Sequence, residues 1–143
     1  MILVDVNLLI YATNRGSAQH LQARDWLDRT LNGSESVGLP WAALLGFLRL
    51  ATARRVYTTP LTMALAWEQV LDWLSIDRVS IPQPTSRHAE VLGELLKVAG
   101  VNANLIPDAH LAALAIEHGL TLCSTDGDFA RFPGLRWENP LAD

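Results

Sequence analysis

Four aspartates stand at positions where carboxylates could act together. Asp5 follows the apolar run 2–4, Asp126 and Asp128 follow the apolar run 120–124, and Asp108 follows a proline at the start of an apolar segment. If the two runs are parallel strands, three of these acids lie beyond strand carboxyl ends, where open parallel sheets bind ligands. Carboxylates brought together repel, so they need a cation or a shared proton. Hard oxygen ligands of this kind suit Mg²⁺ or Mn²⁺.

Each acid also has an ordinary structural interpretation. Asp108 could simply favour a helix start by interacting with the helix dipole. The segment 126–128, Asp-Gly-Asp, is typical of a turn. Asp5 is harder to explain in this way, because an ionisable group beside an apolar strand is costly to bury without a partner. No lysine or arginine follows it until Arg15.

The charge balance argues against a general nucleic-acid binder, which would normally be basic. Eleven basic and fifteen acidic residues give a net charge of −4, and ten of the basic residues are arginines, Lys97 being the exception. Phosphate chemistry on this chain would therefore need metal ions or a local arginine patch. The four aspartates carry −4 between them, so the excess acidity could lie in a single site.

Length and composition indicate one folded domain covering residues 1–143. Half of the 143 residues are hydrophobic and 18% are charged, which excludes disordered, collagen-like and disulfide-scaffold proteins. Cys123 is the single cysteine, so no internal disulfide is possible and a reducing, cytoplasmic location is expected. No apolar run approaches the ~20 residues of a membrane span, and the N-terminus lacks the basic region of a signal peptide.

Hydrophobic periodicity predicts alternating strands and helices. The predicted strands cover residues 2–4, 37–39, 79–81, 120–124 and 135–138, and the predicted helices cover 18–31, 41–54, 62–74, 86–99 and 107–118. Ser17 is a candidate N-cap, Ala99 closes the apolar stripe of the fourth helix, and Gly119 is the expected stop of the last. This alternation favours an α/β fold with a mostly parallel sheet.

Three segments then resemble a known family. They are Asp5-Val6-Asn7, the stretch 106–115 (Ile-Pro-Asp-Ala-His-Leu-Ala-Ala-Leu-Ala), and 124–129 (Ser-Thr-Asp-Gly-Asp-Phe) followed by Arg-Phe-Pro-Gly at 131–134. In this order they resemble PIN-domain ribonucleases, and most closely the VapC toxins of bacterial toxin–antitoxin pairs. The resemblance covers nearly the whole chain.

The resemblance implies a three-layer α/β/α PIN-like domain with a mostly parallel central sheet and endonucleolytic cleavage of RNA with Mg²⁺, for which Mn²⁺ could substitute. It assigns metal binding and catalysis to Asp5, Asp108 and Asp126, with Asp128 as an accessory catalytic acid. Asn7 and Thr125 match polar positions beside the site. The expected partners are the RNA substrate, a VapB-like antitoxin that holds the toxin inactive, and a second copy in a homodimer.

One position departs from the family pattern. A glutamate usually precedes a Phe-Leu-Arg-like segment in the second helix, but Gly46 stands there, before Phe47-Leu48-Arg49. No other acid lies between Glu35 and Glu68, so the number of bound metal ions stays open. Arg49, three residues on, shares the helical face of Gly46 and is a candidate contact for the RNA backbone. Arg54 and Arg55 are further candidates, or simply a solvated helix end, and a structural role is favoured for His110.

Three other functions stay open. A haloacid-dehalogenase-type phosphatase also begins with an acid after its first strand, but it would want a second acid where Asn7 lies. A phosphoacceptor receiver domain would need an acid pair and a late lysine that the chain lacks. A catalytically silent PIN fold that binds RNA or protein without cutting is the most serious alternative, because of the missing glutamate.

Overall fold

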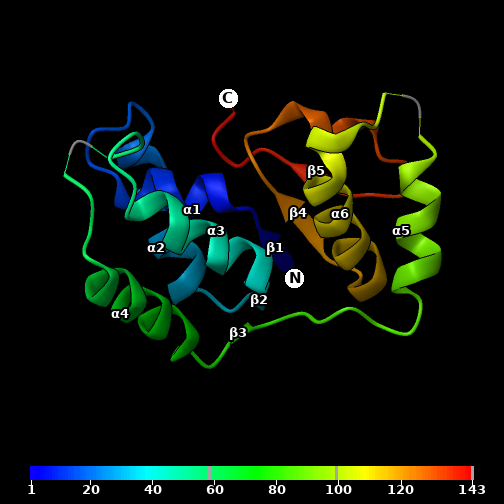
Figure 1. The fold of residues 1–143 in the computed structure, drawn as a ribbon. Coiled ribbons are helices and arrows are strands. Elements are labelled where there is room, and N and C mark those ends of the chain that lie inside the picture. Colours follow the sequence, from blue (N-terminus) through cyan, green and yellow to red (C-terminus); the bar gives the residue numbers. More distant parts are fainter. Residues whose placement is uncertain (58, 99, 143) are drawn as a thin grey trace.

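A five-stranded parallel sheet forms the centre of the molecule, and helices cover both of its faces (Figure 1). The computed structural model describes residues 1–57, 59–98 and 100–142. The strands lie in the order β3-β2-β1-β4-β5, and each neighbouring pair is parallel. Their bounds are Ile2–Val4 (β1), Val37–Gly38 (β2), Val79–Ser80 (β3), Thr121–Cys123 (β4) and Trp137–Glu138 (β5).

Six α-helices and two 3₁₀ helices occupy the described residues. They are α1 Val6–Thr13, α2 His20–Asn32, α3 Trp41–Ala51, α4 Met63–Leu74, α5 His88–Leu96, η1 Ala103–Leu105, α6 Ile106–His118 and η2 Gly127–Arg131. In Figure 1, α1–α4 lie on one side of the sheet and α5 and α6 on the other. The expected three-layer α/β/α architecture with a parallel sheet is confirmed.

The strand β1 divides the core into two layers. Ile2 and Val4 point into a cluster built with residues of α1–α4, whereas Leu3 points into a second cluster with α5, α6 and Phe129. Successive side chains of a strand face opposite sides of a sheet, so a continuous apolar run was the correct sign of a strand buried on both faces. The strand is therefore held rigidly, together with Asp5, which follows it.

The structure differs from the sequence predictions mainly at element ends. The segment Val6–Thr13, for which the pattern predicts no element, is the helix α1. The first predicted helix begins at His20, and its cap residue is Gln19 rather than Ser17. The helix predicted for 41–54 ends at Ala51, and the helix predicted for 86–99 is α5; Ala99 lies outside the described residues. Gly119 does end α6, in the left-handed conformation with φ 68°.

None of the helices in the described ranges is long and apolar enough to cross a membrane. This agrees with the absence of a ~20-residue apolar run in the sequence.

Candidate metal centre

Asp5 is held at the junction between the sheet and α1. Its backbone N–H continues the β1–β4 ladder by donating to the carbonyl of Cys123 at 3.0 Å. Its side chain caps α1 by accepting from the backbone N–H of Val6 at 2.8 Å, and only 6% of the residue is exposed. Burial is the largest influence on this carboxyl and raises its pKa, with a further rise from the charge of Asp126, against the opposing hydrogen bonds from Ser124 and Val6.

Ser124 links three of the polar residues at this edge. Its hydroxyl donates to Oδ2 of Asp5 at 2.8 Å and accepts from Nδ2 of Asn7 at 3.2 Å and from the backbone N–H of Asp126 at 3.0 Å. A serine hydroxyl offers one donor and two acceptor positions, so its capacity is fully used. Ser124 is completely buried, so these bonds fix the relative positions of their partners.

The turn after β4 carries two further acids. Asp126 caps the 3₁₀ helix η2, with Oδ1 accepting from the backbone N–H of Asp128 at 2.9 Å. The Asp-Gly-Asp segment is therefore a turn, as its residue types predict, but both carboxylates remain directed toward the site. The segment is therefore both an ordinary turn and a part of the acidic site.

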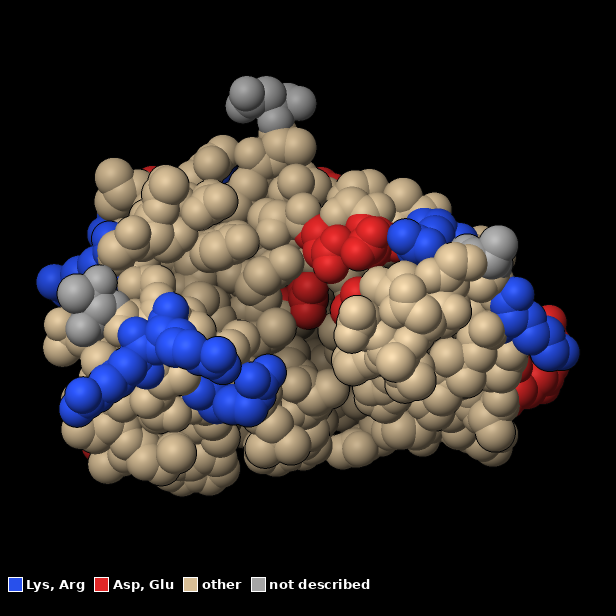
Figure 2. All heavy atoms as spheres, turned by 45° about the horizontal axis from the view of Figure 1, so that its top comes forward, with Lys and Arg blue, Asp and Glu red and all other residues tan. Residues whose placement is uncertain are grey.

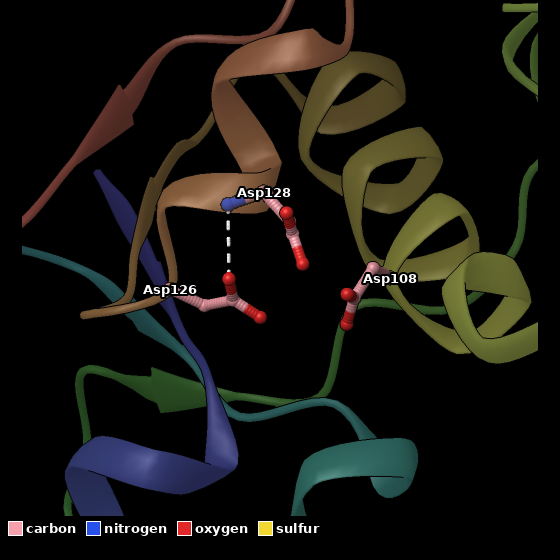
Figure 3. Close-up of side chains that lie close together, drawn as sticks. All are labelled: Asp108, Asp126 and Asp128. Atoms are coloured by element: carbon pink, nitrogen blue, oxygen red, sulfur yellow. Dashed lines mark hydrogen bonds between the residues drawn. The ribbon is translucent and has the colours of Figure 1, made fainter. Parts of the chain in front are cut away.

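Asp108 completes the acidic cluster from the first turn of α6, after Pro107. One carboxylate oxygen each from Asp108, Asp126 and Asp128 lies within 4.8 Å of the others, and Figure 3 shows the three side chains converging from α6 and from the β4–η2 turn. Burial raises the pKa of Asp108, and the neighbouring carboxylates add to the effect, bringing it to about 6. Those carboxylates are, in order of influence, Asp5, Asp126 and Asp128.

The cluster differs in membership from the predicted ligand set. Asp108 and Asp126 come together as expected, but the third close oxygen belongs to Asp128, not to Asp5. Asp5 lies close enough to raise the pKa of Asp108, yet both of its oxygens already accept hydrogen bonds within the fold. Asp5 is therefore a buried acid near the cluster, held in place by Val6 and Ser124.

The chemistry of these donors fits a divalent metal ion. Three convergent carboxylates are the hard oxygen ligands that Mg²⁺ and Mn²⁺ prefer. A second observation supports the fit: Oδ1 of Asn7 is buried and has no hydrogen-bond partner among the described residues. Unpaired buried polar atoms are costly, and this one belongs to a side chain already bound to Ser124, so it is free to take a ligand at the same edge.

The remaining predicted site residues have mixed positions. Thr125 is half-buried between Ser124 and Asp126, and Arg49 is exposed in the last turn of α3. A Cβ on Gly46 would lie 3.2 Å from Cγ2 of Val6. Gly46 thus permits close contact between α3 and the start of α1, and its missing side chain does not leave open space.

A second polar cluster lies between α5 and α6. The side chain of Glu117 is fully buried, pairs with Nδ1 of His88 at 2.5 Å, and accepts from the backbone N–H and hydroxyl of Thr85 at 2.9 and 2.7 Å. Nε2 of His88 lies 3.0 Å from Nδ1 of His110. His110 therefore bonds toward α5, in agreement with the structural role that the sequence favoured for it.

The charged surface agrees with this arrangement. Figure 2 shows acidic side chains gathered in one hollowed patch near the middle of the face, and basic side chains gathered over a neighbouring part of it. Arg49, Arg54 and Arg55 are all exposed, and none has an ion-pair partner in the described part of the chain. An anionic ligand could therefore reach the acids only with a cation in place, while arginines attract its remaining charge.

Sequence reasoning missed Ser124 and Glu117 as organising residues. Ser124 could have been found from its place at the end of an apolar strand, directly before two candidate site residues. Glu117 lies near the end of the largely apolar helix α6, and nothing in the local pattern shows that its side chain is buried.

The comparisons with known proteins point in one direction. A model of the PIN domain matches residues 2–135. The chain is 46% identical over 142 residues to ribonuclease VapC37 of Mycobacterium tuberculosis, covering 99% of each chain, and 42% identical over 143 residues to ribonuclease VapC33 of the same species, covering 100% of each.

Solved structures share the fold at lower identity. M. tuberculosis VapC20, described as a toxin that cleaves the sarcin–ricin loop, has a TM-score of 0.66 at 22% identity, covering 95% of this chain and 99% of that one. VapBC2 of Rickettsia felis, bound to a promoter DNA fragment, has a TM-score of 0.67 at 20% identity, covering 97% and 98%. At these identities the likeness concerns the fold alone.

Proposed function

Because this chain belongs to the PIN-domain family and groups within it with the VapC ribonucleases, we propose that it is a toxin that cleaves RNA and is neutralised by a cognate antitoxin. The observation that carries the proposal is the convergence of Asp108, Asp126 and Asp128 within 4.8 Å. Neither rival enzyme class fits this site, because each would need residues that the chain lacks.

We propose that the acidic cluster binds Mg²⁺, or Mn²⁺ in its place, through Asp108, Asp126 and Asp128. A divalent ion there would offset the charge of the RNA phosphate and lower the pKa of a water molecule, which supplies the nucleophile at neutral pH. Asp126 and Asp128 are placed to orient that water. Asp5 contributes negative charge from below, and Ser124 holds Asp5 and Asp126 in fixed relation.

The arginines supply a path for the RNA backbone. Arg49 stands on α3 and Arg54 and Arg55 on the segment after it, all exposed, and Figure 2 shows basic side chains on the face that carries the acidic patch. Guanidinium groups bind phosphates through paired N–H donors. Asn7 and Thr125 lie beside the acids and complete the proposed substrate contacts.

Metal-dependent cleavage tests the proposal directly. The wild-type chain should cleave RNA with Mg²⁺ or Mn²⁺ and lose activity in EDTA. Asp5→Asn should abolish cleavage without unfolding the protein, because Asn keeps the size of Asp5 and a cap acceptor. Mapping the new RNA ends in cells, with the Asp5→Asn chain as control, would identify the target.

The same experiment distinguishes a nuclease from a catalytically silent PIN fold. That alternative is favoured by one observation, the glycine at position 46 in place of an acid. A silent fold would bind RNA equally in Mg²⁺ and in EDTA and would produce no new RNA ends. Wild-type cleavage by the Asp5→Asn protein would refute the proposed chemistry altogether.

We further propose that the chain assembles with an antitoxin and with a second copy of itself. Leu45 on α3 and Trp67 and Leu71 on α4 are 58%, 42% and 48% exposed, which supports a covered apolar surface in the working complex. We expect the antitoxin to lie in the groove beside α3 and to present an arginine to the acids. Sedimentation of the toxin alone should show a dimer at micromolar concentration.

The packing supports one domain over residues 1–143, because both core clusters are built on the same strand β1. A cytoplasmic location is also proposed. Cys123 is buried, and burial raises the pKa of its thiol to about 12. A thiol of this kind is inert, in keeping with a protein that needs no disulfide.

A further inference from the structure

Arg131, the last residue of η2, forms two hydrogen bonds with Asp128. Its Nη2 donates to Oδ1 of Asp128 at 3.1 Å, and its Nε donates to the backbone carbonyl of the same residue at 3.3 Å. One guanidinium edge thus bonds to both the side chain and the main chain of one acid. A lysine could not reproduce this contact, because its ammonium is a single point charge without a planar fork.

These two hydrogen bonds restrict the orientation of the Asp128 carboxylate. An aspartate has two side-chain torsions, so fixing one oxygen against Arg131 also orients the other. In Figure 3, one oxygen of Asp128 points into the space between Asp126 and Asp108. The backbone N–H of Asp128 in turn donates to Asp126 at 2.9 Å, so two members of the cluster depend on the placement of this turn.

The guanidinium is itself enclosed on another side. A Cβ built on Gly100 would lie 2.5 Å from Nη1 of Arg131, and Gly100 has φ 86°. The backbone after α5 therefore approaches Arg131 closely, and the left-handed conformation at Gly100 favours glycine there. Arg131 is about one-third exposed, which is low for a surface arginine and consistent with a held side chain.

We propose that Arg131 is a positioning residue for metal binding, which holds Asp128 so that one of its oxygens faces the cluster. The inference rests on the proposed function, since it concerns the same acidic site. Hydrogen bonds to ligand carboxylates typically change metal affinity 10–100-fold when they are removed. Arg131 touches neither Asp108 nor Asp126 by a hydrogen bond or ion pair in the described structure, so a positioning effect on the cluster must pass through Asp128.

Removing Arg131 could change Mn²⁺ affinity in two opposite directions, so the measured direction tests the proposal. As a mere positive charge near the site, Arg131 would repel Mn²⁺, and its removal would tighten metal binding. As a positioning residue, it strengthens metal binding, and its removal weakens it. Arg131→Lys separates the two, because it keeps the charge and loses the fork.

The experiment is calorimetric titration of the full chain with Mn²⁺, without RNA. Arg131→Lys and Arg131→Gln should each raise the Kd for Mn²⁺ about tenfold. Arg24→Gln is the matched control, because Arg24 also pairs with a neighbouring aspartate, Asp25, on the surface; its Kd should equal that of the wild type. In an Asp128→Asn background, the Arg131 substitutions should not change the Kd for Mn²⁺ further, since the carboxylate that Arg131 positions is already absent.

Several results would overturn the inference. A wild-type Kd in Arg131→Lys would show that only charge matters, and tighter binding in Arg131→Gln would show repulsion. Equal losses with and without Asp128 would show a general structural defect instead of positioning. If the wild type binds Mn²⁺ but does not cleave RNA, the proposed function fails while the Arg131 titrations still decide this inference; if it binds no Mn²⁺, both fail.

Discussion

Replacing Asp108 by asparagine should stabilise the metal-free protein at neutral pH. Burial and three neighbouring carboxylates raise the pKa of Asp108 from 3.8 to about 6. One pKa unit corresponds to about 1.4 kcal/mol, so the ionised carboxylate costs the fold at most about 3 kcal/mol. The side chain is only partly buried, and solvent screening reduces the expected gain to about 1–2 kcal/mol.

The sign of the pH dependence follows from proton binding. Between pH 3.8 and about 6, the folded protein keeps the Asp108 proton that the unfolded chain has already lost. The contribution of this group to stability is therefore full below pH 3.8 and is lost as the pH rises through about 6. Asparagine does not titrate, so the stability advantage of the variant over the wild type should grow through this window and reach its full size above about pH 6.

Thermal melts in EDTA from pH 4 to pH 8 measure the effect. The difference in melting temperature should grow from near zero at pH 4 to roughly 3–8 °C above pH 6.5. Asp72→Asn, which removes an exposed carboxylate on α4, is the control and should change little at any pH. Added Mn²⁺ should then raise the melting temperature of the wild type more than that of Asp108→Asn, because the variant has lost a ligand.

Two results would refute this reasoning. Equal melting temperatures at pH 8 would mean that burial and the neighbouring carboxylates do not destabilise the ionised form of Asp108 as the structure implies. A difference that is constant from pH 4 to pH 8 would mean that asparagine acts through packing or hydrogen bonding instead of charge.

Two further substitutions test the residues that support the site. Glu117→Gln should lower the free energy of unfolding in urea by about 2–3 kcal/mol at pH 7. Burial raises the pKa of Glu117, but the bonds from Thr85 and His88 outweigh it and lower the pKa below 4.5. The stability lost in the variant should therefore shrink as the pH falls through that lowered pKa, and a loss that is constant with pH would contradict the assignment. Gly46→Glu should lower the melting temperature by displacing Val6, at a cost of about 1–3 kcal/mol, with no gain in Mn²⁺ affinity; tighter Mn²⁺ binding in calorimetry would show instead that Gly46 marks a vacant ligand position.

The sequence predicted which acids lie at the site better than it predicted which of their oxygens lie close together. Residue type and position after a strand located Asp5 and Asp126, because those signals are local. The exchange of Asp5 for Asp128 among the close oxygens could not be predicted. It depends on how hydrogen bonds from the adjacent Val6 and from Ser124 hold the Asp5 carboxylate. Ser124 lies 119 positions further along the chain, so its contact is not visible in the local sequence.

An ambiguous local pattern and a long-range contact explain the other omissions. Helix α1 was missed because a run of apolar and β-branched residues has no clear period, and its start depends on the cap from Asp5. The role proposed for Arg131 depends on the approach of Gly100 from another segment. The approach of Gly100 to Arg131 leaves no mark in the local pattern, whereas hydrophobic periodicity was sufficient for most helices and for the α/β class with a mostly parallel sheet.

The topology itself accounts for the meeting of the acids and for its cost. β1 and β4 are hydrogen-bonded parallel neighbours, so the residues that follow them, Asp5 and the 124–126 segment, leave the sheet at the same edge. Helix α6 leads back to the start of β4, so its own first turn, with Asp108, lies at that edge too. A parallel sheet of this connectivity therefore gathers three negative segments without any attraction between them, and the raised pKa of Asp108 reflects first its burial and then their repulsion. A divalent cation would turn that repulsion into binding energy, which is why metal affinity and metal-free stability should change in opposite directions in Asp108→Asn.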